Sequence, residues 1–308
     1  MTATDIAIVG VGKIARDQHL PSIERSDAFR LAAAVSRNAK VDGVENFETI
    51  DALLEARPDI AAVALCMPPQ SRFAAAWAAL SAGKHVMLEK PPGATIAEVQ
   101  ALIRLAKDKK VTLFATWHSR FAHAVPEAKA WLATRMITSV EIVWKEDVRR
   151  WHPGQEWIWQ PGGLGVFDPG INALSILTEI MPHPVHVTAT ELDFPEGRDA
   201  PIAARIDFVD HQGTAMTADF DWRQTGPQTW DITIGTDAGT LKLSSGGAEL
   251  AIDGKRVSKG KDREYDRLYA RFGNLIARNE IDVDLAPLTH VADAFMLGRR
   301  VVTDRFDM

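Results

Sequence analysis

The stretch Ile6-Ala7-Ile8-Val9-Gly10-Val11-Gly12-Lys13-Ile14-Ala15 joins an apolar run to the pattern Gly-x-Gly-x-x-Ala. The apolar run predicts a buried strand, and the glycines predict a tight turn that opens a helix. Gly10 permits the turn, Gly12 lets the backbone approach a pyrophosphate, and Ala15 allows close helix–strand packing. Because a helix N-terminus presents unpaired N–H groups to phosphates, we predict a dinucleotide site that includes Gly10, Gly12, Lys13 and Ile14. A plain turn between a strand and a helix is the alternative.

The composition limits the classes of protein to which the chain can belong. Its 308 residues are enough for two domains, and a formal charge of −6 gives no basic excess that would favour a nucleic-acid partner. Nine tryptophans supply aromatic faces that suit sugar rings as well as cores. The single cysteine, Cys66, excludes an internal disulfide and a four-cysteine zinc site, and we predict no metal.

The N-terminal sequence and the lengths of the apolar runs bear on location. The chain enters the fingerprint strand within five residues, which leaves no room for a signal peptide before it. No apolar run is long enough to cross a membrane. We therefore expect a cytoplasmic protein with no membrane partner.

The end of the second apolar run bears on the choice of dinucleotide. Residues 31–35 predict a strand, and Ser36-Arg37-Asn38 follows it about 20 residues past the glycines. An acidic residue there would bind a ribose 2′-hydroxyl and repel a 2′-phosphate, but none is present. Ser36 can donate a hydrogen bond, and Arg37 can pair with the phosphate or lie on the adenine face. We predict NADP, with NAD as the alternative and a solvated loop arginine as the other interpretation of Arg37.

Strands and helices alternate through the rest of the first half. Continuous apolar runs at 60–65, 85–88 and 111–115 predict buried strands, and helices are predicted at 49–56, 71–82 and after the capping box of Thr95 and Glu98. Five alternations with short links indicate a parallel doubly wound sheet, so we assign residues 1–120 to an NADP-binding Rossmann domain.

Two proline-stiffened loops follow strands of this predicted sheet. Pro68 and Pro69 come after one strand, and Glu89-Lys90-Pro91-Pro92 comes after the next. Ligands of open α/β sheets bind at the carboxyl ends of the strands, so we predict that Pro68, Glu89 and Lys90 border the cofactor. For Lys90, the alternative is an ordinary exposed loop lysine.

From about residue 125 the apolar residues alternate with a period of two. Such runs at 140–144, 185–192, 202–208, 214–222, 230–234 and 240–243 predict an antiparallel sheet with one solvated face. Helices are predicted at 126–134, 168–180 and 265–277 beside this sheet, and a last one at 288–300 packs on either domain. We assign residues 121–308 to a substrate-binding α/β domain.

Residues 149–172 hold many polar, aromatic and glycine residues and predict a loop that closes over a polar ligand. Within it, Asp168 and Asn172 are four residues apart and share a helix face once the helix has begun. The alternative for Asp168 is a simple N-terminal helix cap, with Pro169 at the first helical position.

The fingerprint, the Pro-Pro loop, Glu89-Lys90-Pro91 and Gly162-Gly163…Asp168-x-Gly170-x-Asn172, in this order, resemble the Gfo/Idh/MocA oxidoreductase family over nearly the whole chain. The resemblance implies a Rossmann domain and a C-terminal α/β domain with an open, mainly antiparallel sheet, whose free face often forms a homodimer. It implies that Lys90 lies near the nicotinamide and the reacting hydroxyl, and that Asp168 is the acidic member of the site. Many members have histidine where this chain has Asn172, which argues against an Asp–His relay through that position.

Within the family, Trp151-His152-Pro153 and Trp157-Ile158-Trp159 resemble the aldose 1-dehydrogenases that act on L-arabinose or D-galactose. The implied reaction moves hydride from C1 of an aldopyranose (L-arabinose, D-galactose or D-fucose) to NADP⁺ and gives the aldonolactone. An aspartate is ionised at neutral pH whereas a lysine must first lose its charge, so we favour Asp168 as the base and Lys90 as the charge that acidifies the hydroxyl, over the reverse. The expected sugar contacts are Asn172, His118, His152, Trp151 and Trp230, with core packing as the alternative for the four aromatic residues.

Two other functions compete with this one. A relative of the same family could oxidise another polyol such as an inositol, or reduce an imine, although Asn172 argues against the inositol type. A non-catalytic regulator that binds nucleotide and sugar is the second alternative, and the presence of both Lys90 and Asp168 disfavours it.

Overall fold

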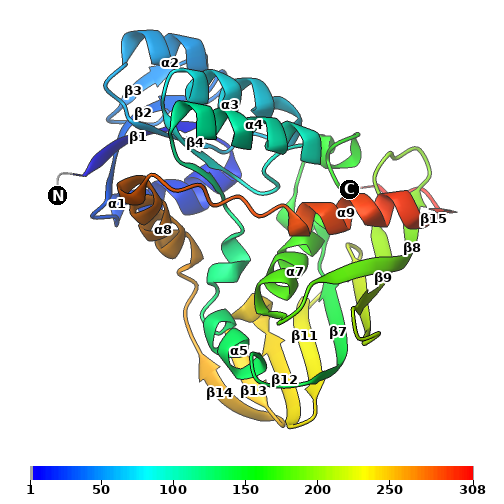
Figure 1. The fold of residues 1–308 in the computed structure, drawn as a ribbon. Coiled ribbons are helices and arrows are strands. Elements are labelled where there is room, and N and C mark those ends of the chain that lie inside the picture. The colour runs from blue at the N-terminus through cyan, green and yellow to red at the C-terminus, as the bar shows by residue number, and fades with distance from the viewer. Residues whose placement is uncertain (1–2, 308) are drawn as a thin grey trace. The chain divides into compact units, whose positions relative to one another are not determined.

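The computed structural model describes residues 3–307, which form two compact units. Unit 1 comprises the chain up to His118 together with Glu264–Asp284, and unit 2 comprises Ser119–Arg263 together with the chain from Leu285. Each unit is built on its own sheet (Figure 1). Residues 264–284 therefore belong to unit 1, although the sequence analysis placed them with the second domain.

The sheet of unit 1 has six parallel strands in the order β3-β2-β1-β4-β5-β6. Residues 6–9 and 62–65 of its two central strands are buried, as expected for parallel strands covered on both faces. The strand order reverses between β1 and β4, and ligands of such sheets bind at the carboxyl ends of the strands beside this point. The strands are β1 Thr4–Val9, β2 Phe29–Val35, β3 Glu45–Phe47, β4 Ala62–Leu65, β5 His85–Leu88 and β6 Leu113–Ala115.

The helices of unit 1 begin where the sequence signals predict. Thr49 and Thr95 each accept a backbone N–H three residues on, and the carboxylate of Glu98 accepts the N–H of Ala94. A π-helical turn over Ala15–His19 follows the fingerprint. The other helices are α1 Leu20–Glu24, α2 Ile50–Ala56, α3 Arg72–Ser81, α4 Ile96–Lys109 and α8 Glu264–Arg278.

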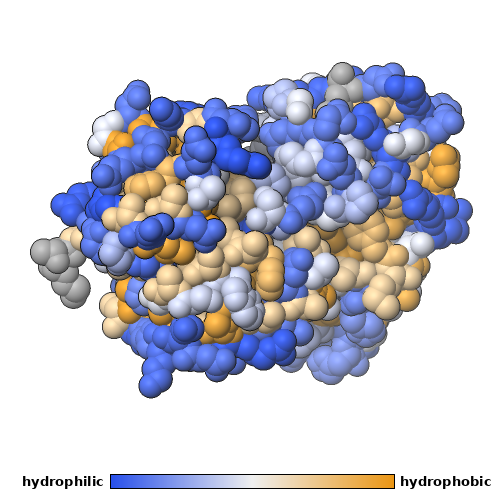
Figure 2. All heavy atoms as spheres, turned by 90° about the horizontal axis from the view of Figure 1, so that it is seen from above, coloured by the Kyte–Doolittle hydropathy of each residue, from blue (hydrophilic) through white to orange (hydrophobic). Residues whose placement is uncertain are grey.

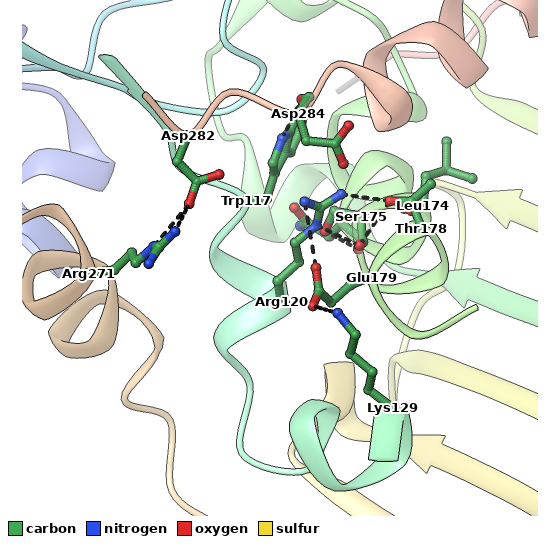
Figure 3. Close-up of polar contacts among 11 residues, drawn as sticks. Trp117, Arg120, Lys129, Leu174, Ser175, Thr178, Glu179, Arg271, Asp282 and Asp284 are labelled. Atoms are coloured by element: carbon green, nitrogen blue, oxygen red, sulfur yellow. Dashed lines mark hydrogen bonds and ion pairs between the residues drawn. The ribbon is translucent and has the colours of Figure 1, made fainter. Parts of the chain in front are cut away.

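Helix α8 packs on the sheet of unit 1 through one apolar face. Phe272 stacks on Phe29 of β2 with ring centroids 5.4 Å apart, and it lies 6.1 Å from Phe114 of β6. After α8 the chain runs beside β6, where Asp282 exchanges backbone hydrogen bonds with Leu113 and Ala115. Figure 3 shows how this return segment is held: Arg271 binds the Asp282 carboxylate, and Trp117 donates to the carbonyl of Asp284.

The sheet of unit 2 has nine strands in the order β14-β13-β12-β11-β7-β10-β9-β8-β15. It is mainly antiparallel, as predicted, and within residues 3–307 only the neighbours β7·β10 and β8·β15 run parallel. The strands are β7 Ile137–Lys145, β8 Val185–Pro195, β9 Ala203–Asp210, β10 Ala215–Asp221, β11 Thr229–Thr236, β12 Gly239–Ser244, β13 Glu249–Ile252, β14 Lys255–Lys259 and β15 Gly298–Thr303.

The helices of unit 2 are α5 Val125–Leu132, α6 Val148–Trp151, α7 Phe167–Ile180 and α9 Ala286–Leu297. Helix α7 packs on the sheet, with Phe167 edge-on to Phe220 of β10 and Gly170 so close that a Cβ there would lie 2.7 Å from the Phe220 ring. The last helix belongs to unit 2 and ends three residues before the predicted end, because the chain turns extended at Gly298 and forms β15.

Hydrophilic and hydrophobic residues share the face of the molecule that Figure 2 shows. Among residues 3–307, no helix is both long and apolar enough to span a membrane, and no group of His, Cys, Asp and Glu side chains has an arrangement suited to a metal ion. The exposed large apolar side chains include Trp77, Met136, Val257, Phe295, Met296, Leu297 and Val302.

Candidate active site

The fingerprint turn of unit 1 has the backbone that its glycines predict. Gly10 has a φ of +92°, and a Cβ there would lie 2.6 Å from the backbone nitrogen of Met67, so only glycine fits. At Gly12 a Cβ would meet nothing within 4 Å, so the turn is open on that side. Ala15 is fully buried against the sheet. These features match the requirements of a pyrophosphate-binding turn.

The other predicted nucleotide contacts follow the ends of neighbouring strands. Ser36 and Arg37 come directly after β2, where Ser36 donates its N–H to Phe47 and Arg37 is exposed. Pro68 is exposed after β4. Lys13 is exposed and its ammonium forms an ion pair with Asp17 one helical turn on.

A buried arginine that the sequence analysis missed ties these loops together. Arg72, at the start of α3, donates to the carbonyls of Met67, Glu89 and Pro91. The first of these residues precedes the Pro-Pro loop, and the other two flank Lys90. An arginine at the start of an amphipathic helix is normally taken for a surface residue, so the sequence holds no clear signal for this contact.

Glu89 lies inside unit 1, in a buried polar network. It is 3% exposed, and its carboxylate accepts hydrogen bonds from the Tyr265 hydroxyl at 2.5 Å and from the backbone N–H of Lys90. His19 Nε2 lies 3.3 Å from the same carboxylate, and its Nδ1 lies 2.8 Å from the Tyr269 hydroxyl. The residue preceding Lys90 is thus anchored from two distant parts of the sequence.

The network shifts the pKa values of its members. Burial alone would raise the pKa of Glu89, but the hydrogen bond and charge of His19 outweigh it and lower this pKa to about 2. Burial likewise opposes the charged form of His19, yet its neighbours raise its pKa well above the ordinary value. Burial and the adjacent Glu89 raise the pKa of Tyr265. The Glu89–His19 pair is therefore held in its charged form.

His118 lies beside this network. Its Nδ1 is 2.5 Å from Oε2 of Glu264, and its ring stacks on Tyr265 with centroids 5.4 Å apart. Burial lowers the pKa of His118 and the Lys90 charge opposes protonation, but the bond to Glu264 outweighs both and raises it. His118 and Lys90 are therefore electrostatic neighbours within unit 1.

In unit 2, Asp168 is a member of α7 rather than its cap. Val166 precedes the helix with helical backbone angles, and Asp168 is its second residue, so the capping alternative is wrong. Asp168 is 4% exposed, and its Oδ2 lies 3.4 Å from Nε2 of His152. Asn172 is half-buried one turn further along the helix. A histidine from another element thus contacts Asp168, which the spacing of residues 168 and 172 did not predict.

Helix α7 is anchored through its later turns by Arg120. Nε of Arg120 donates to the carbonyl of Ser175 at 2.9 Å, and Nη2 of the same side chain donates to the Thr178 hydroxyl at 2.8 Å (Figure 3). A weaker contact of 3.8 Å joins Arg120 to Glu179. This bracing fixes the helix that carries Asp168.

The glycine-rich segment before α7 is closely packed. A Cβ on Gly163 would lie 2.1 Å from the carbonyl oxygen of Trp157, and one on Gly165 would lie 2.3 Å from that of Pro201. The segment also contains two short helical turns, α6 and Glu156–Trp159. Its glycines therefore serve close backbone contacts.

The predicted tryptophans meet at a cleft in unit 2. The rings of Trp151 and Trp230 lie 5.6 Å apart, and a second pair of rings, His152 and Trp222, lies 5.2 Å apart. The cleft has a volume of about 340 Å³ and is lined by Arg150, Trp151, Gln228, Trp230, Asp231, Ser244 and Ser245. Aromatic faces flanked by amide, hydroxyl and charged groups suit a small polyhydroxylated ligand.

Comparison with known proteins agrees with this picture. The model of the Gfo/Idh/MocA family, described as an oxidoreductase family with an NAD-binding Rossmann fold, matches residues 4–116. Galactose 1-dehydrogenase of Pseudomonas fluorescens is 46% identical over 301 residues, which cover 98% of both chains. The crystal structure of D-galactose-1-dehydrogenase from Rhizobium etli is 58% identical, with a TM-score of 0.96 over 100% of this chain and 99% of that one.

These findings define an NAD(P)-binding oxidoreductase with a Rossmann fold. The chain belongs to the Gfo/Idh/MocA oxidoreductase family, as its motifs predicted. More distant structures share the fold alone: KijD10, a 3-ketoreductase from Actinomadura kijaniata solved with NADP and TDP-benzene, has a TM-score of 0.83 at 17% identity.

Proposed function

We propose that this oxidoreductase removes a hydride from C1 of D-galactose and transfers it to NADP⁺, giving the aldonolactone. The observation that carries the proposal is the combination, in unit 2, of a buried Asp168–His152 pair with a tryptophan-lined cleft, in a chain 58% identical to a D-galactose-1-dehydrogenase. L-arabinose and D-fucose present the same ring hydroxyls and differ at the exocyclic carbon, so they are further candidate substrates.

The protein groups have distinct roles in the proposed chemistry. Asp168 takes the proton of the C1 hydroxyl, and the ammonium of Lys90 lowers the pKa of that hydroxyl by its positive charge. The nicotinamide, when bound, accepts the hydride. Asn172, His118, Trp151 and Trp230 are the proposed sugar contacts.

Position 172 holds asparagine instead of the histidine found in many members of the family, and His152 supplies an imidazole beside Asp168 in its stead. Asn172 cannot carry a proton, but Nε2 of His152 lies 3.4 Å from Asp168 and can receive the proton that Asp168 has taken. Its Nδ1 lies 3.4 Å from Oε1 of Gln155, which fixes the ring from the other side. We therefore assign His152 as the outlet for the proton.

The catalytic roles are tested with Lys90→Met and Asp168→Asn, which remove one charge each and keep similar volumes. Asp168→Asn is expected to lower kcat about 10²- to 10⁴-fold, as for the loss of a general base, and Lys90→Met about 10²- to 10³-fold, as for the loss of an electrostatic stabiliser. The measurement is NADPH formation across a panel of aldoses and inositols. NADPH binding, followed by its fluorescence, should survive in Asp168→Asn. Near-normal turnover in either variant would exclude that residue from the chemistry.

The preference for NADP is supported by the sequence at the end of β2, where Ser36 and Arg37 stand and no acidic residue follows the strand. Arg37→Ala should weaken NADP by about 1–3 kcal/mol and leave NAD unchanged, because it removes a hydrogen bond to a charged group. The ratio of kcat/KM with the two cofactors measures this. An unchanged ratio would remove Arg37 from the proposal.

We also propose that the exposed face of the sheet in unit 2 forms a homodimer. Alternate residues of β9 and β10, among them Arg205, Asp207 and Thr217, are exposed on this face. Light scattering of the native protein should give twice the mass of one chain. Thr217→Arg should reduce the measured mass to that of a single chain. A native monomer would contradict the proposal.

A further inference from the structure

Glu146 is a buried acidic residue to which the proposed reaction gives no role. It follows β7 directly and is 6% exposed. Its backbone is fixed on both sides, because its N–H donates to Asp221 and its carbonyl accepts the N–H of Gln224. Glu146 therefore lies at the end of the sheet of unit 2 where β7 and β10 finish.

The two carboxylate oxygens of Glu146 each accept a hydrogen bond from a different indole. Nε1 of Trp222 lies 3.2 Å from Oε1, and Nε1 of Trp230 lies 3.0 Å from Oε2. Trp222 follows β10, and Trp230 belongs to β11. An indole N–H can only donate, so it requires an acceptor at this point. One side chain thus fixes two tryptophans that come from separate elements.

The two tryptophans serve different parts of the candidate active site. Trp230 lines the cleft and lies against Trp151. Trp222 is fully buried and lies against His152, which contacts Asp168. A displacement of the Glu146 carboxylate would therefore move a wall of the cleft and a ring that packs against the Asp168–His152 pair.

We propose that Glu146 is a positioning residue for sugar binding, which acts by holding the rings of Trp222 and Trp230. The proposal rests on the proposed function, because the ligand of the cleft is taken to be the sugar. Its two observed side-chain hydrogen bonds go to the indoles of these two tryptophans.

The geometry requires a carboxylate rather than its amide. Glutamine has the same shape, but it offers one oxygen acceptor and one NH₂ donor. In Glu146→Gln, the NH₂ group would face one of the two indole N–H groups, donor against donor. A buried donor without an acceptor is unfavourable, so one ring must move or the amide must turn away.

The first experiment compares Glu146→Gln with Asp210→Asn in steady-state assays with D-galactose and NADP⁺. Asp210 is the control, because its carboxylate is also buried and accepts N–H bonds, both on Oδ1, from Gln212 and Thr214, but it lies at the other end of β9. Glu146→Gln should raise the galactose KM about tenfold, since the loss of one such bond is of that order, and leave the NADP⁺ KM unchanged. Asp210→Asn should change neither constant.

Two outcomes of this assay would overturn the proposal. An unchanged galactose KM in Glu146→Gln would show that the indoles do not need the carboxylate. An equal rise in Asp210→Asn, or a parallel rise in the NADP⁺ KM, would assign the effect to a general loss of stability.

The second experiment asks whether Glu146 acts through Trp230. Trp230→Phe and the double variant with Glu146→Gln are assayed beside the single variants. If Glu146 acts through Trp230, both changes weaken the same hydrogen bond, so the galactose KM of the double variant should not exceed that of the worse single variant by more than about twofold. Effects that multiply would mean that Glu146 does not act through Trp230 and would overturn its role in holding that ring.

A third measurement separates this proposal from the proposed function. If the native protein oxidises no aldose, the proposed function fails, and the positions of the indoles are judged without sugar by near-ultraviolet circular dichroism. A changed tryptophan spectrum in Glu146→Gln and an unchanged one in Asp210→Asn would support the positioning role. Spectra of both variants that are identical to the spectrum of the native protein would refute it.

Discussion

Glu89 in unit 1 and Glu146 in unit 2 are both buried carboxylates that accept hydrogen bonds from aromatic side chains, but the donors differ in kind. Glu89 is bound by His19 and Tyr265, which can gain or lose a proton. Glu146 is bound by two indoles, which do not titrate in the range where proteins fold. The donors to Glu89 therefore add a pH dependence of their own to stability, whereas the donors to Glu146 stay in one form throughout.

The sign of the pH dependence in unit 1 follows from the two pKa shifts. The pKa of Glu89 falls from 4.5 to about 2 on folding, so its contribution is present above 4.5 and is lost as the pH falls toward 2. The pKa of His19 rises above 6.5, so its contribution is present below 6.5 and is lost as the pH rises through the folded value. The pair therefore stabilises unit 1 most between about pH 4.5 and 6.5.

The largest effect is expected for Glu89→Gln. This change leaves His19 buried without its carboxylate, which should lower the free energy of unfolding by about 3–5 kcal/mol at pH 6. The native protein should lose about 3 kcal/mol between pH 4.5 and 2, and the variant should lack this acid limb. Urea unfolding at several pH values measures both. A variant with the native acid limb would contradict the assigned role of Glu89.

A somewhat smaller effect is expected for His19→Gln, because Tyr265 and the Lys90 N–H still bind Glu89 in that variant. The free energy of unfolding should fall by about 3 kcal/mol at pH 6. The gap to the native protein should narrow as the pH is raised, because the native protein loses the charge of His19. Urea unfolding from pH 6 to 9 tests this, and a gap that widens with pH would mean that His19 is neutral in the fold.

Tyr265→Phe removes one donor to Glu89 and keeps the ring. The loss of a hydrogen bond to a charged group should cost about 2 kcal/mol at pH 6. The pKa of Glu89 should rise at the same time, because this bond helps to lower it. The acid limb of the stability curve should still begin near pH 4.5, which the unfolded state sets, but it should be smaller and end at a higher pH than in the native protein. Thermal unfolding from pH 2 to 6 shows whether the limb shrinks.

The smallest effect is expected for Trp230→Phe, the matching change in unit 2. Trp230 is only half-buried, so the loss of its bond to Glu146 should cost about 1 kcal/mol. The indole does not titrate, so between pH 6 and 9 the stability of the variant should stay a constant amount below that of the native protein, whereas the gap for His19→Gln changes over the same range. A new pH dependence in this variant would remove the contrast between the two carboxylates.

Much of the fold could be predicted because its signals are local. Gly10 at positive φ, the capping threonines Thr49 and Thr95, and the buried runs of β1 and β4 each act within a few residues. The short strand at the end of the chain could not be found in this way. Strand β15 is half exposed and follows a helix directly, so it has neither an apolar run nor a turn to mark it.

The residues of the candidate site differ in the same way: some have a local signal in the sequence, and others depend on distant contacts. Lys90 and Asp168 stand in motifs that resemble those of the family, so both could be proposed from the sequence. Arg72 and Glu146 act through contacts with residues that are distant in the chain, and each looks like an ordinary helix or loop residue. His152 was named, but its contact with Asp168 depends on the packing of two segments that no periodicity links.

The return of residues 264–284 to unit 1 has a consequence for how the chain is made. A ribosome completes every strand from β7 to β14 before it delivers α8. Until then, Glu89 lacks Tyr265, and the aromatic rings on one side of the first sheet lack their cover. The nucleotide-binding unit, although begun first, can therefore be finished only after most of the other has emerged, so a chain cut after the sixth strand would yield an unfinished Rossmann fold.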